Sequence, residues 1–240
     1  MKTIIPPIDK ILLERELNKD TFLRDTNNGN NEIYIISDID SPNAVREIGR
    51  LREVTFRDAG GGTGKDIDLD SYDLGNHAFK QLVLWDPKEK EIIGGYRYNR
   101  CSELEITPKG EVLSPTSRLF KYSKQFINDY FPYTIELGRS FVQPLYQPTF
   151  NLRRGMYALD NLWDGLGAVL IENPDLKYLF GKVTMYTHFD KLARDIILFF
   201  LQKYFPDPDK LIFPIVALKR ETSDKVLNSM FTGCNYDEDY

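Results

Sequence analysis

The residues best suited to chemistry in this sequence gather in one short segment, YTIELGRSFV, at positions 133–142. Alternation along a β-strand places Glu136 and Gly138 on one face, and Arg139 and Phe141 on the other. A glutamate, a glycine and a serine on one face suggest a polar pocket at a strand end, where a carboxylate can accept a proton. The glycine weakens the strand and indicates a bulge, or the close approach of a second backbone or a ligand.

A second candidate segment is LREVTFRDAGGGTGKDIDLDSYD, residues 51–73, which joins a helix end to a glycine cluster and then to several aspartates. It could be a surface loop, a cradle for a metal or a phosphate, or one wall of an active site. The aspartates are suitable calcium ligands, but the segment lacks the glycine and the terminal glutamate of an EF-hand loop. The GGGTGK run does not complete the P-loop pattern, and no strand-to-helix switch follows it.

The elements that must position these segments follow from periodicity and from breaker residues. Ser41 and Pro42 can begin a helix that the glycine cluster ends, so residues 42–58 are predicted as a helix with three of its arginines, Arg46, Arg50 and Arg57, mostly in solvent. Further on we expect a β-hairpin over 81–86 and 91–100, the strand 133–142 and a long helix over 149–173. After these we expect a strand over 177–186, a helix over 187–205 that begins with a Thr187/Asp190 capping box, and an extended segment over 210–218. This alternation predicts an α/β (α+β) fold, with one mixed sheet sandwiched by helices in a single domain over residues 1–240.

Composition excludes several classes of function. The net charge of −5 and the pI near 5.2 argue against a nucleic-acid-binding protein. The sequence has two cysteines, Cys101 and Cys234, which form no disulfide framework, so we expect reduced thiols. These cysteines and the two histidines, His77 and His188, do not have metal-ligand spacing, so we expect no metal site. The chain carries no signal-like segment and no apolar run long enough to span a membrane, so we expect a cytoplasmic protein.

Four motifs in order, LREVTF, DIDLDSYD, IIGGYRY and ELGRSFV, resemble the amino-acid N-acyltransferases of the ornithine-lipid and glycine-lipid type, often labelled hemolysins. That family is similar in turn to the acyl-homoserine-lactone synthases, and both belong to the GNAT superfamily. The resemblance covers roughly residues 45–205 and implies a GNAT-like, mostly antiparallel central sheet. It also implies residues 1–30 as an N-terminal extension, and it leaves open whether a C-terminal segment is missing.

The resemblance also implies a set of site residues. Glu136 would be the catalytic base, and the acceptor would be bound by Arg52, Phe56, Asp70, Asp73, Arg97 and Arg139. The donor would be bound near Ser140, Phe141 and Val142, through backbone N–H groups between two splayed strands, and by Arg153 and Arg154 at the following helix start. The glycine cluster would then be a flexible segment that closes over the ligand.

The implied reaction moves a fatty acyl group from the phosphopantetheine thioester of acyl carrier protein to the amine of an amino acid, giving a lyso-lipid precursor. No cofactor is bound permanently in such a reaction. NLRRGMYA stands where acetyl-CoA-using GNAT enzymes carry a Q/R-x-x-G-x-G/A signature, which favours a carrier-protein donor over free coenzyme A.

Several alternatives stay open from the sequence. A lactone-synthase-like enzyme, a coenzyme A-dependent acetyltransferase and a catalytically silent GNAT-like binding module share the same motifs. The apolar run DIILFFLQKYF can be a core helix or a point of peripheral membrane contact.

Overall fold

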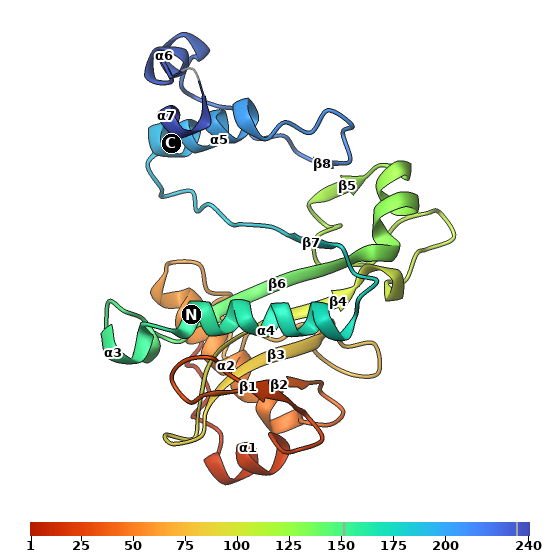
Figure 1. Cartoon of the computed structure of the whole chain (residues 1–240), viewed down its shortest axis with the longest axis vertical. Helices are drawn as coiled ribbons and strands as arrows, with labels where there is room; N and C mark the ends of the chain where they lie inside the picture. The colour runs from red at the N-terminus through yellow and green to blue at the C-terminus, as the bar shows by residue number, and fades with distance from the viewer. Residues whose placement is uncertain (151, 234) are drawn as a thin grey trace. The chain divides into compact units, whose positions relative to one another are not determined.

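The computed structural model describes residues 1–150, 152–233 and 235–240, and two compact units make up the chain (Figure 1). The large unit contains Met1–Pro115 and Phe131–Lys182, and the small unit contains Thr116–Tyr130 and Val183–Tyr240. The sequence predicts one domain and carries no sign of this division, because each unit is assembled from two separate stretches without a recognisable linker.

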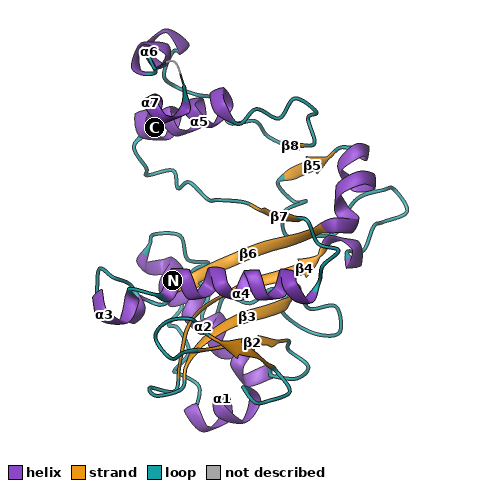
Figure 2. Ribbon diagram, viewed as in Figure 1, coloured by secondary structure: helices purple, strands orange, loops and turns teal. Residues whose placement is uncertain are grey.

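The large unit is built on a six-stranded sheet of order β1-β2-β3-β4-β6-β7 (Figure 2). Neighbouring strands run antiparallel except β6 and β7, which are parallel. The mostly antiparallel sheet predicted from the resemblance is therefore confirmed. The strands are β1 (Phe22–Asp25), β2 (Glu32–Ile36), β3 (Lys80–Asp86), β4 (Glu91–Arg100), β6 (Thr134–Val142) and β7 (Tyr178–Gly181).

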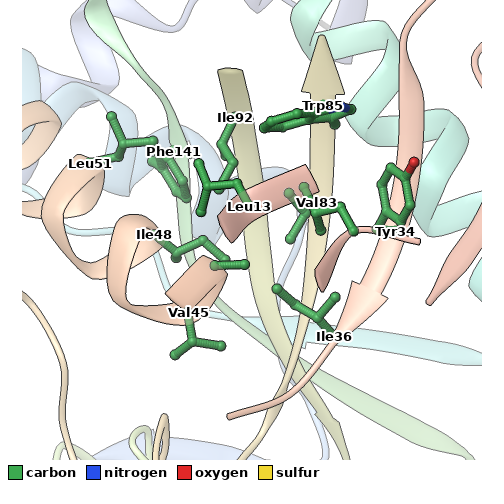
Figure 3. Close-up of a cluster of buried hydrophobic side chains, with 12 residues drawn as sticks. Leu13, Tyr34, Ile36, Val45, Ile48, Leu51, Val83, Trp85, Ile92 and Phe141 are labelled. Carbon is green, nitrogen blue, oxygen red and sulfur yellow. The ribbon is translucent and has the colours of Figure 1, made fainter. Parts of the chain in front are cut away.

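Two helices cover the two faces of this sheet, each over its own hydrophobic core. Helix α2 (Pro42–Asp58) packs with α1 (Lys10–Glu16) on one face, where Ile48, Leu51 and Phe141 belong to one cluster of buried side chains (Figure 3). Helix α4 (Ala158–Glu172) covers the other face, as Figure 1 shows, and its cluster includes Ile135. The sandwich of helices around a mixed sheet is thus observed as predicted.

Helix α2 has the predicted bounds, but its first turn is capped in an unexpected way. The side chain of Ser41 makes no capping hydrogen bond. Instead the carboxylate of Glu16 accepts from the N–H of Asn43 at 3.1 Å and from the N–H of Ala44 at 2.7 Å. A carboxylate at a helix N-terminus also interacts favourably with the helix dipole. The predicted N-terminal extension is therefore integrated with the sheet unit, because β1 also pairs with β2.

Three predicted elements differ from those observed. The long helix expected over 149–173 is interrupted, and α3 (Leu152–Gly155) precedes α4. Strand β7 covers only four of the ten residues expected over 177–186. Helix α5 (Lys191–Tyr204) begins at Asp190, whose side chain accepts from the N–H of Ala193 at 2.8 Å, so the Thr187 capping box is wrong.

The small unit pairs β5 (Phe120–Tyr122) with β8 (Ile212–Pro214) in an antiparallel ladder. Its helices are α5, α6 (Asp224–Met230) and α7 (Tyr236–Asp239). A shorter helical turn occurs in this unit at Phe126–Tyr130, and the large unit has such turns at Cys101–Glu103, Phe131–Tyr133 and Pro144–Tyr146. In the described ranges, none of the helices is long and apolar enough to cross a membrane.

Candidate active site

Helix α2 places one arginine in the interior of the large unit. Arg52 is fully buried on the helix face that also carries Leu51, and its guanidinium donates to Asp73 Oδ1 at 2.8 Å and to Gln81 Oε1 at 2.6 Å. The amide of Gln81 in turn donates to Asp73 Oδ1 at 3.1 Å. Because a buried charge is tolerated only when it is paired and hydrogen-bonded, these three side chains must fold as one network.

The turn after the aspartate-rich segment aims one carboxylate inward and leaves another partly outside. Asp73 Oδ2 accepts from the N–H of Asp70 at 3.0 Å, and Asp70 Oδ1 accepts from the N–H of Tyr72 at 2.9 Å. Asp73 is fully buried, whereas 27% of the Asp70 side chain is exposed. Only Asp70 of this pair therefore presents a carboxylate that a ligand can reach.

A second arginine closes this network from the sheet. Arg97 on β4 donates through Nη1 to Asp70 Oδ1 at 2.7 Å and to Asp73 Oδ2 at 2.8 Å, and its guanidinium carbon lies 5.9 Å and 5.7 Å from the ring centroids of Tyr72 and Phe79. Burial opposes the charge of Arg97, but Asp73 and Asp70 raise its pKa. Burial likewise opposes ionisation of Asp73, yet the neighbouring Arg52 and Arg97 hold its pKa below the ordinary value. The charged forms of Arg97 and Asp73 therefore stabilise each other.

A bulge in β6 brings the third arginine to the same face. On β4, Gly95 pairs with Phe141 of β6 and Arg97 pairs with Gly138 of β6. The two β6 residues between Gly138 and Phe141 therefore lie opposite a single residue of β4. Arg139, the first of the two, has a φ of +51°, in the left-handed region that non-glycine residues rarely adopt. Its Nη2 lies 3.2 Å from Asp68 Oδ1 and 3.6 Å from Asp70 Oδ2.

The bulge corrects the predicted faces of this strand. Strict alternation puts Ile135, Arg139 and Phe141 together, opposite Glu136. In the structure Ile135 packs on the α4 side and Phe141 on the α2 side, while Arg139 pairs with the aspartates that Arg97 also contacts. One extra residue shifts the alternation by one, so every side chain after it changes face.

Asp68 was not predicted as a site residue, although it lies at the centre of this charged cluster. Its side chain is buried, and its backbone N–H donates to the carbonyl of Gly49 on α2 at 3.0 Å. Gly49 allows this contact, because an added Cβ would lie 2.6 Å and 2.8 Å from side-chain atoms of Leu69 and Ile67. Burial raises the pKa of Asp68 against the attraction of Arg139. The alternation DIDLD was the available signal, since positions two apart in an extended segment share a face.

Glu136 lies on the face of the sheet that carries Arg97. It is buried, and it stands opposite Asn99 of β4 and Phe180 of β7. Since Gly138 opposes Arg97, Glu136 is separated from that pair by two positions, about 7 Å along the strand. The predicted base and two of the predicted arginines therefore meet on one surface of the sheet.

Two further groups lie in the electrostatic field of Glu136. Burial lowers the pKa of Lys182, as do Arg139 and Arg97, and Glu136 acts in the opposite direction. The pKa of the free, buried thiol of Cys101 is raised to about 12 by burial and by the nearby Glu136. The thiol therefore stays protonated, and Cys234 lies outside the described residues.

The predicted donor-binding residues have different environments. The parallel pairing of β6 with β7 ends at Leu137 and Gly181, so the last five residues of β6 extend beyond it. The N–H of Gln143 donates to the carbonyl of Ile93 on β4 at 2.9 Å. Because backbone N–H groups alternate in direction along a strand, the N–H of Val142 points away from β4 and the N–H of Phe141 points toward β4. Of these two donors, Val142 alone lies on the free edge.

The remaining predicted residues are less closely tied to the cluster. Ser140 is exposed within the bulge, and Phe56 packs against the α2-side core. Arg153 and Arg154 belong to α3, and their side chains lie outside the described structure.

The glycine cluster is held in place rather than left open. Glu53 on α2 accepts from the N–H of Thr63 at 3.0 Å, from its hydroxyl at 2.6 Å and from the N–H of Gly64 at 2.8 Å. Arg57 also donates to Glu53, at 2.9 Å, so this arginine and Arg50, which pairs with Glu47, are partly buried rather than mostly in solvent. The amides of Thr63 and Gly64 are therefore not available to a phosphate, and closure of the glycine cluster over a ligand stays a prediction.

Among the residues that the structure describes, no group of three or more histidine, cysteine or acidic side chains is arranged to hold a metal ion. Asp68, Asp70 and Asp73 pair with arginines instead. The contacts within this cluster are therefore ion pairs between carboxylates and guanidiniums.

Comparison with known proteins agrees with this geometry. Residues 51–154 match the family model described as an acetyltransferase (GNAT) domain, a stretch that holds the whole charged cluster apart from Lys182. Such a domain transfers acyl groups. Over all 240 residues the chain is 50% identical to the glycine N(alpha)-acyltransferases of Phocaeicola vulgatus and Bacteroides thetaiotaomicron, of which it spans 74% and 71%. This chain belongs to the GNAT-type amino-acid N-acyltransferases, as its four motifs predicted. No solved structure matches it significantly.

Proposed function

We propose that the protein moves a fatty acyl group from the phosphopantetheine thioester of acyl carrier protein to the amine of glycine, giving an N-acylglycine that serves as a lyso-lipid precursor. The identity of 50% to two proteins named glycine N(alpha)-acyltransferase favours glycine over ornithine. The observation that carries the proposal is the placement of Glu136 and the partly exposed Arg139 on one face of β6, where β7 stops pairing. We expect the reaction to take place in the cytoplasm, with at most peripheral contact with a membrane.

Arg139 is the arginine best placed to bind the acceptor carboxylate. The side chains of Arg52 and Arg97 are at most 3% exposed and donate to Asp73, whereas 33% of the Arg139 side chain is exposed. A guanidinium recognises a carboxylate through paired N–H groups. The buried arginines then support the site, and Arg139 contacts the substrate.

Glu136 is the candidate proton acceptor. A free amino acid is mostly ammonium at neutral pH, so a proton must leave before nitrogen attacks the thioester carbon. Glu136 takes the first proton from the ammonium and releases it to water, and the neutral amine then attacks and forms the C–N bond. When the C–S bond breaks, nitrogen loses its second proton, which Glu136 accepts and passes to the leaving thiolate. Asp70, which keeps part of its carboxylate exposed, can hold the ammonium before transfer, whereas the oxygens of Asp73 are occupied by Arg52 and Arg97.

The free edge of β6 suits the donor arm. The N–H of Val142 points away from β4 beyond the end of the β7 pairing, so it can donate to a pantetheine amide or to the developing oxyanion. The carbonyl of Val142 on the same edge accepts from Gln147 Nε2 at 2.7 Å, which holds this backbone in position.

The test is a product assay with a panel of donors and acceptors. The purified protein is incubated with palmitoyl acyl carrier protein, palmitoyl-CoA or acetyl-CoA, each with glycine, ornithine, alanine or serine, and products are identified by mass spectrometry. We expect N-palmitoylglycine as the main product, formed fastest from the carrier protein.

Other outcomes of the same assay distinguish the alternatives. Acetylated products would favour a coenzyme A-dependent acetyltransferase, and faster reaction with ornithine would replace glycine as the acceptor. If no amino acid is acylated from any donor, the proposed function is wrong and a silent binding module is favoured.

A further inference from the structure

A small open space lies over Gly138, between the candidate base and the candidate carboxylate-binding arginine. A Cβ added to Gly138 would meet no atom within 4 Å. Carbon atoms in contact lie about 3.5–4.0 Å apart, so the position of that missing Cβ can take an additional atom without displacing the protein. Gly138 is partly exposed, so a ligand can reach this space beside the charged cluster.

The walls of this space carry the charges that an amino acid requires. Glu136 lies two positions before Gly138 on the same face, and Arg97 stands directly opposite Gly138 on β4. The bulge turns Arg139, the next residue, toward Asp68 and Asp70 on that face. Lys182 follows Gly181, the last residue of β7 that pairs with β6, and its titration responds to Arg139, Arg97 and Glu136. Cationic groups and carboxylates, Glu136 among them, therefore lie on the face of the sheet where Gly138 leaves a floor without a side chain.

We propose that the space over Gly138 is the acceptor subsite, in which the amino acid lies against the strand backbone with its carboxylate toward Arg139 and its amine toward Glu136. This inference rests on the proposed function and deepens it, because it assigns the place where the acceptor binds. Gly138 is required there for room: the acceptor occupies the volume that any side chain would fill. A floor of bare backbone between two oppositely charged side chains fits a small zwitterionic amino acid.

The test adds one methyl group to the floor. The Gly138→Ala substitution should be tolerated by the fold, since no atom lies within 4 Å of the new Cβ and Gly138 is not among the residues with a positive φ. A matched control is Gly167→Ala on α4, where an added Cβ also meets nothing within 4 Å. We expect both variants to melt at or above the temperature of the unchanged protein, because alanine in place of glycine restricts the unfolded chain.

The two variants should differ in acylation. We expect Gly138→Ala to lower kcat/KM for glycine about 100-fold, the effect of displacing a reactant by about 1 Å, while the KM for the acyl donor stays nearly constant. Gly167→Ala should keep kcat/KM for glycine. Retention of full kcat/KM for glycine by Gly138→Ala would overturn the inference and leave the proposed function intact.

Direct binding separates this inference from the proposed function. Glycine is titrated into the unchanged protein, Gly138→Ala and Gly167→Ala by isothermal calorimetry. We expect heat of binding with the unchanged protein and with Gly167→Ala, and none with Gly138→Ala. Binding that depends on Gly138 without any acyl transfer would support the subsite and reject the reaction. If the unchanged protein neither binds nor acylates glycine, both are wrong. If Gly138→Ala melts early, the space over Gly138 cannot take an additional atom and the inference is overturned.

Discussion

The three arginines of the cluster do different work because their burial and pairing differ. Arg52 and Arg97 share Asp73, and each has its guanidinium in contact with at least two side chains of the network. Arg139 has one close partner, Asp68, and a more distant one, Asp70. Replacing either of the first two would remove one of the two guanidiniums that compensate the buried carboxylate of Asp73, and breaking a buried ion pair typically costs about 3–5 kcal/mol of stability. Their loss would therefore reduce activity through folding, and Arg139 is the informative site for binding.

The ion pair between Arg139 and Asp68 is one hydrogen bond short of a bidentate pair. Arg139 Nη2 contacts Asp68 Oδ1, while Arg139 Nε and Asp68 Oδ2 are buried and make no hydrogen bond. Buried polar atoms are almost always satisfied, so these two atoms indicate that the pair moves, or accepts a water or a ligand atom. Because Asp68 is buried, it acts on the substrate only through the position of Arg139.

Asp68→Asn should therefore weaken acceptor binding without removing chemistry. We expect the KM for glycine to rise about 10-fold or more and kcat to change little, since a hydrogen bond to a charged group contributes about 1.5–3 kcal/mol. Initial rates with glycine and with glycinamide, which lacks the carboxylate, give the measurement, and glycinamide should be unaffected.

The control for this prediction is Asp66→Asn, two positions away, where the aspartate forms only a long, exposed pair with Lys2. In the Arg139→Gln background Asp68→Asn should have no further effect on KM, because the two residues act as one unit. Additive effects in the double variant would show that Asp68 does not act through Arg139.

Glu136→Gln tests the proposed base. The amide keeps the size of the side chain but cannot accept a proton, so kcat should fall about 10²- to 10⁴-fold at neutral pH, the usual contribution of a positioned base. Steady-state rates from pH 6 to 9 give the comparison, with the exposed Glu111→Gln as the control. Unchanged turnover across this range would remove Glu136 from the mechanism.

At the scale of elements, α2 connects the glycine loop to the charged cluster. Its buried face carries Arg52, which enters the site, and Glu53, which holds the loop through Thr63 and Gly64. Burial would raise the pKa of Glu53, but hydrogen bonds from Thr63 and Arg57 and from the N–H of Gly64 lower it. Because the pKa of Glu53 is lower in the folded state than in the unfolded state, the ionised carboxylate stabilises the protein fully above the unfolded pKa of about 4.3. This stabilisation is lost as the pH falls through the folded-state pKa.

Glu53→Gln should therefore destabilise the protein in a pH-dependent way. We expect a loss of about 1–3 kcal/mol in the free energy of unfolding at pH 7, because charge-assisted hydrogen bonds become neutral ones. The difference from the unchanged protein should shrink as the carboxylate of the latter is protonated below about pH 4. Urea unfolding at both pH values measures this, and an equal difference at both would contradict the assigned role of the carboxylate.

The sequence predicted those elements whose boundaries are encoded locally. Pro42 and the glycines after residue 59 delimit α2, and the PKEK turn delimits the β3–β4 hairpin, so both were found. A bulge was one of the two predictions made from Gly138, but the sequence does not show which residue of the strand becomes the extra one. A shift of one residue then reversed the predicted face of Arg139 and Phe141. The resemblance selected arginines and aspartates that the structure brings into one cluster, and burial, which sequence does not show, separated Asp73 from Asp70.

At the scale of the whole molecule, the candidate site belongs to one unit. Arg52, Asp68, Arg97, Glu136 and Arg139 all lie in the large unit, as does Lys182 at its end. Their sequence separation of more than a hundred residues means that the cluster exists only when the complete sheet unit is folded. Any ligand that binds the cluster must therefore stabilise that unit as a whole.

Glycine should accordingly raise the melting temperature of the transition in which the large unit unfolds. At a concentration of 100 times Kd, binding adds about 2.7 kcal/mol, which for a chain of this size corresponds to several degrees. Scanning calorimetry with and without glycine measures the shift, and a transition confined to the small unit should not move. Arg139→Gln should abolish the shift, whereas Arg46→Gln, at an exposed position on α2, should keep it. If the melting temperature still rises with glycine in Arg139→Gln, glycine binds elsewhere in the molecule. Without Arg139, the charged cluster offers the glycine carboxylate only arginines that are buried and already paired with aspartates.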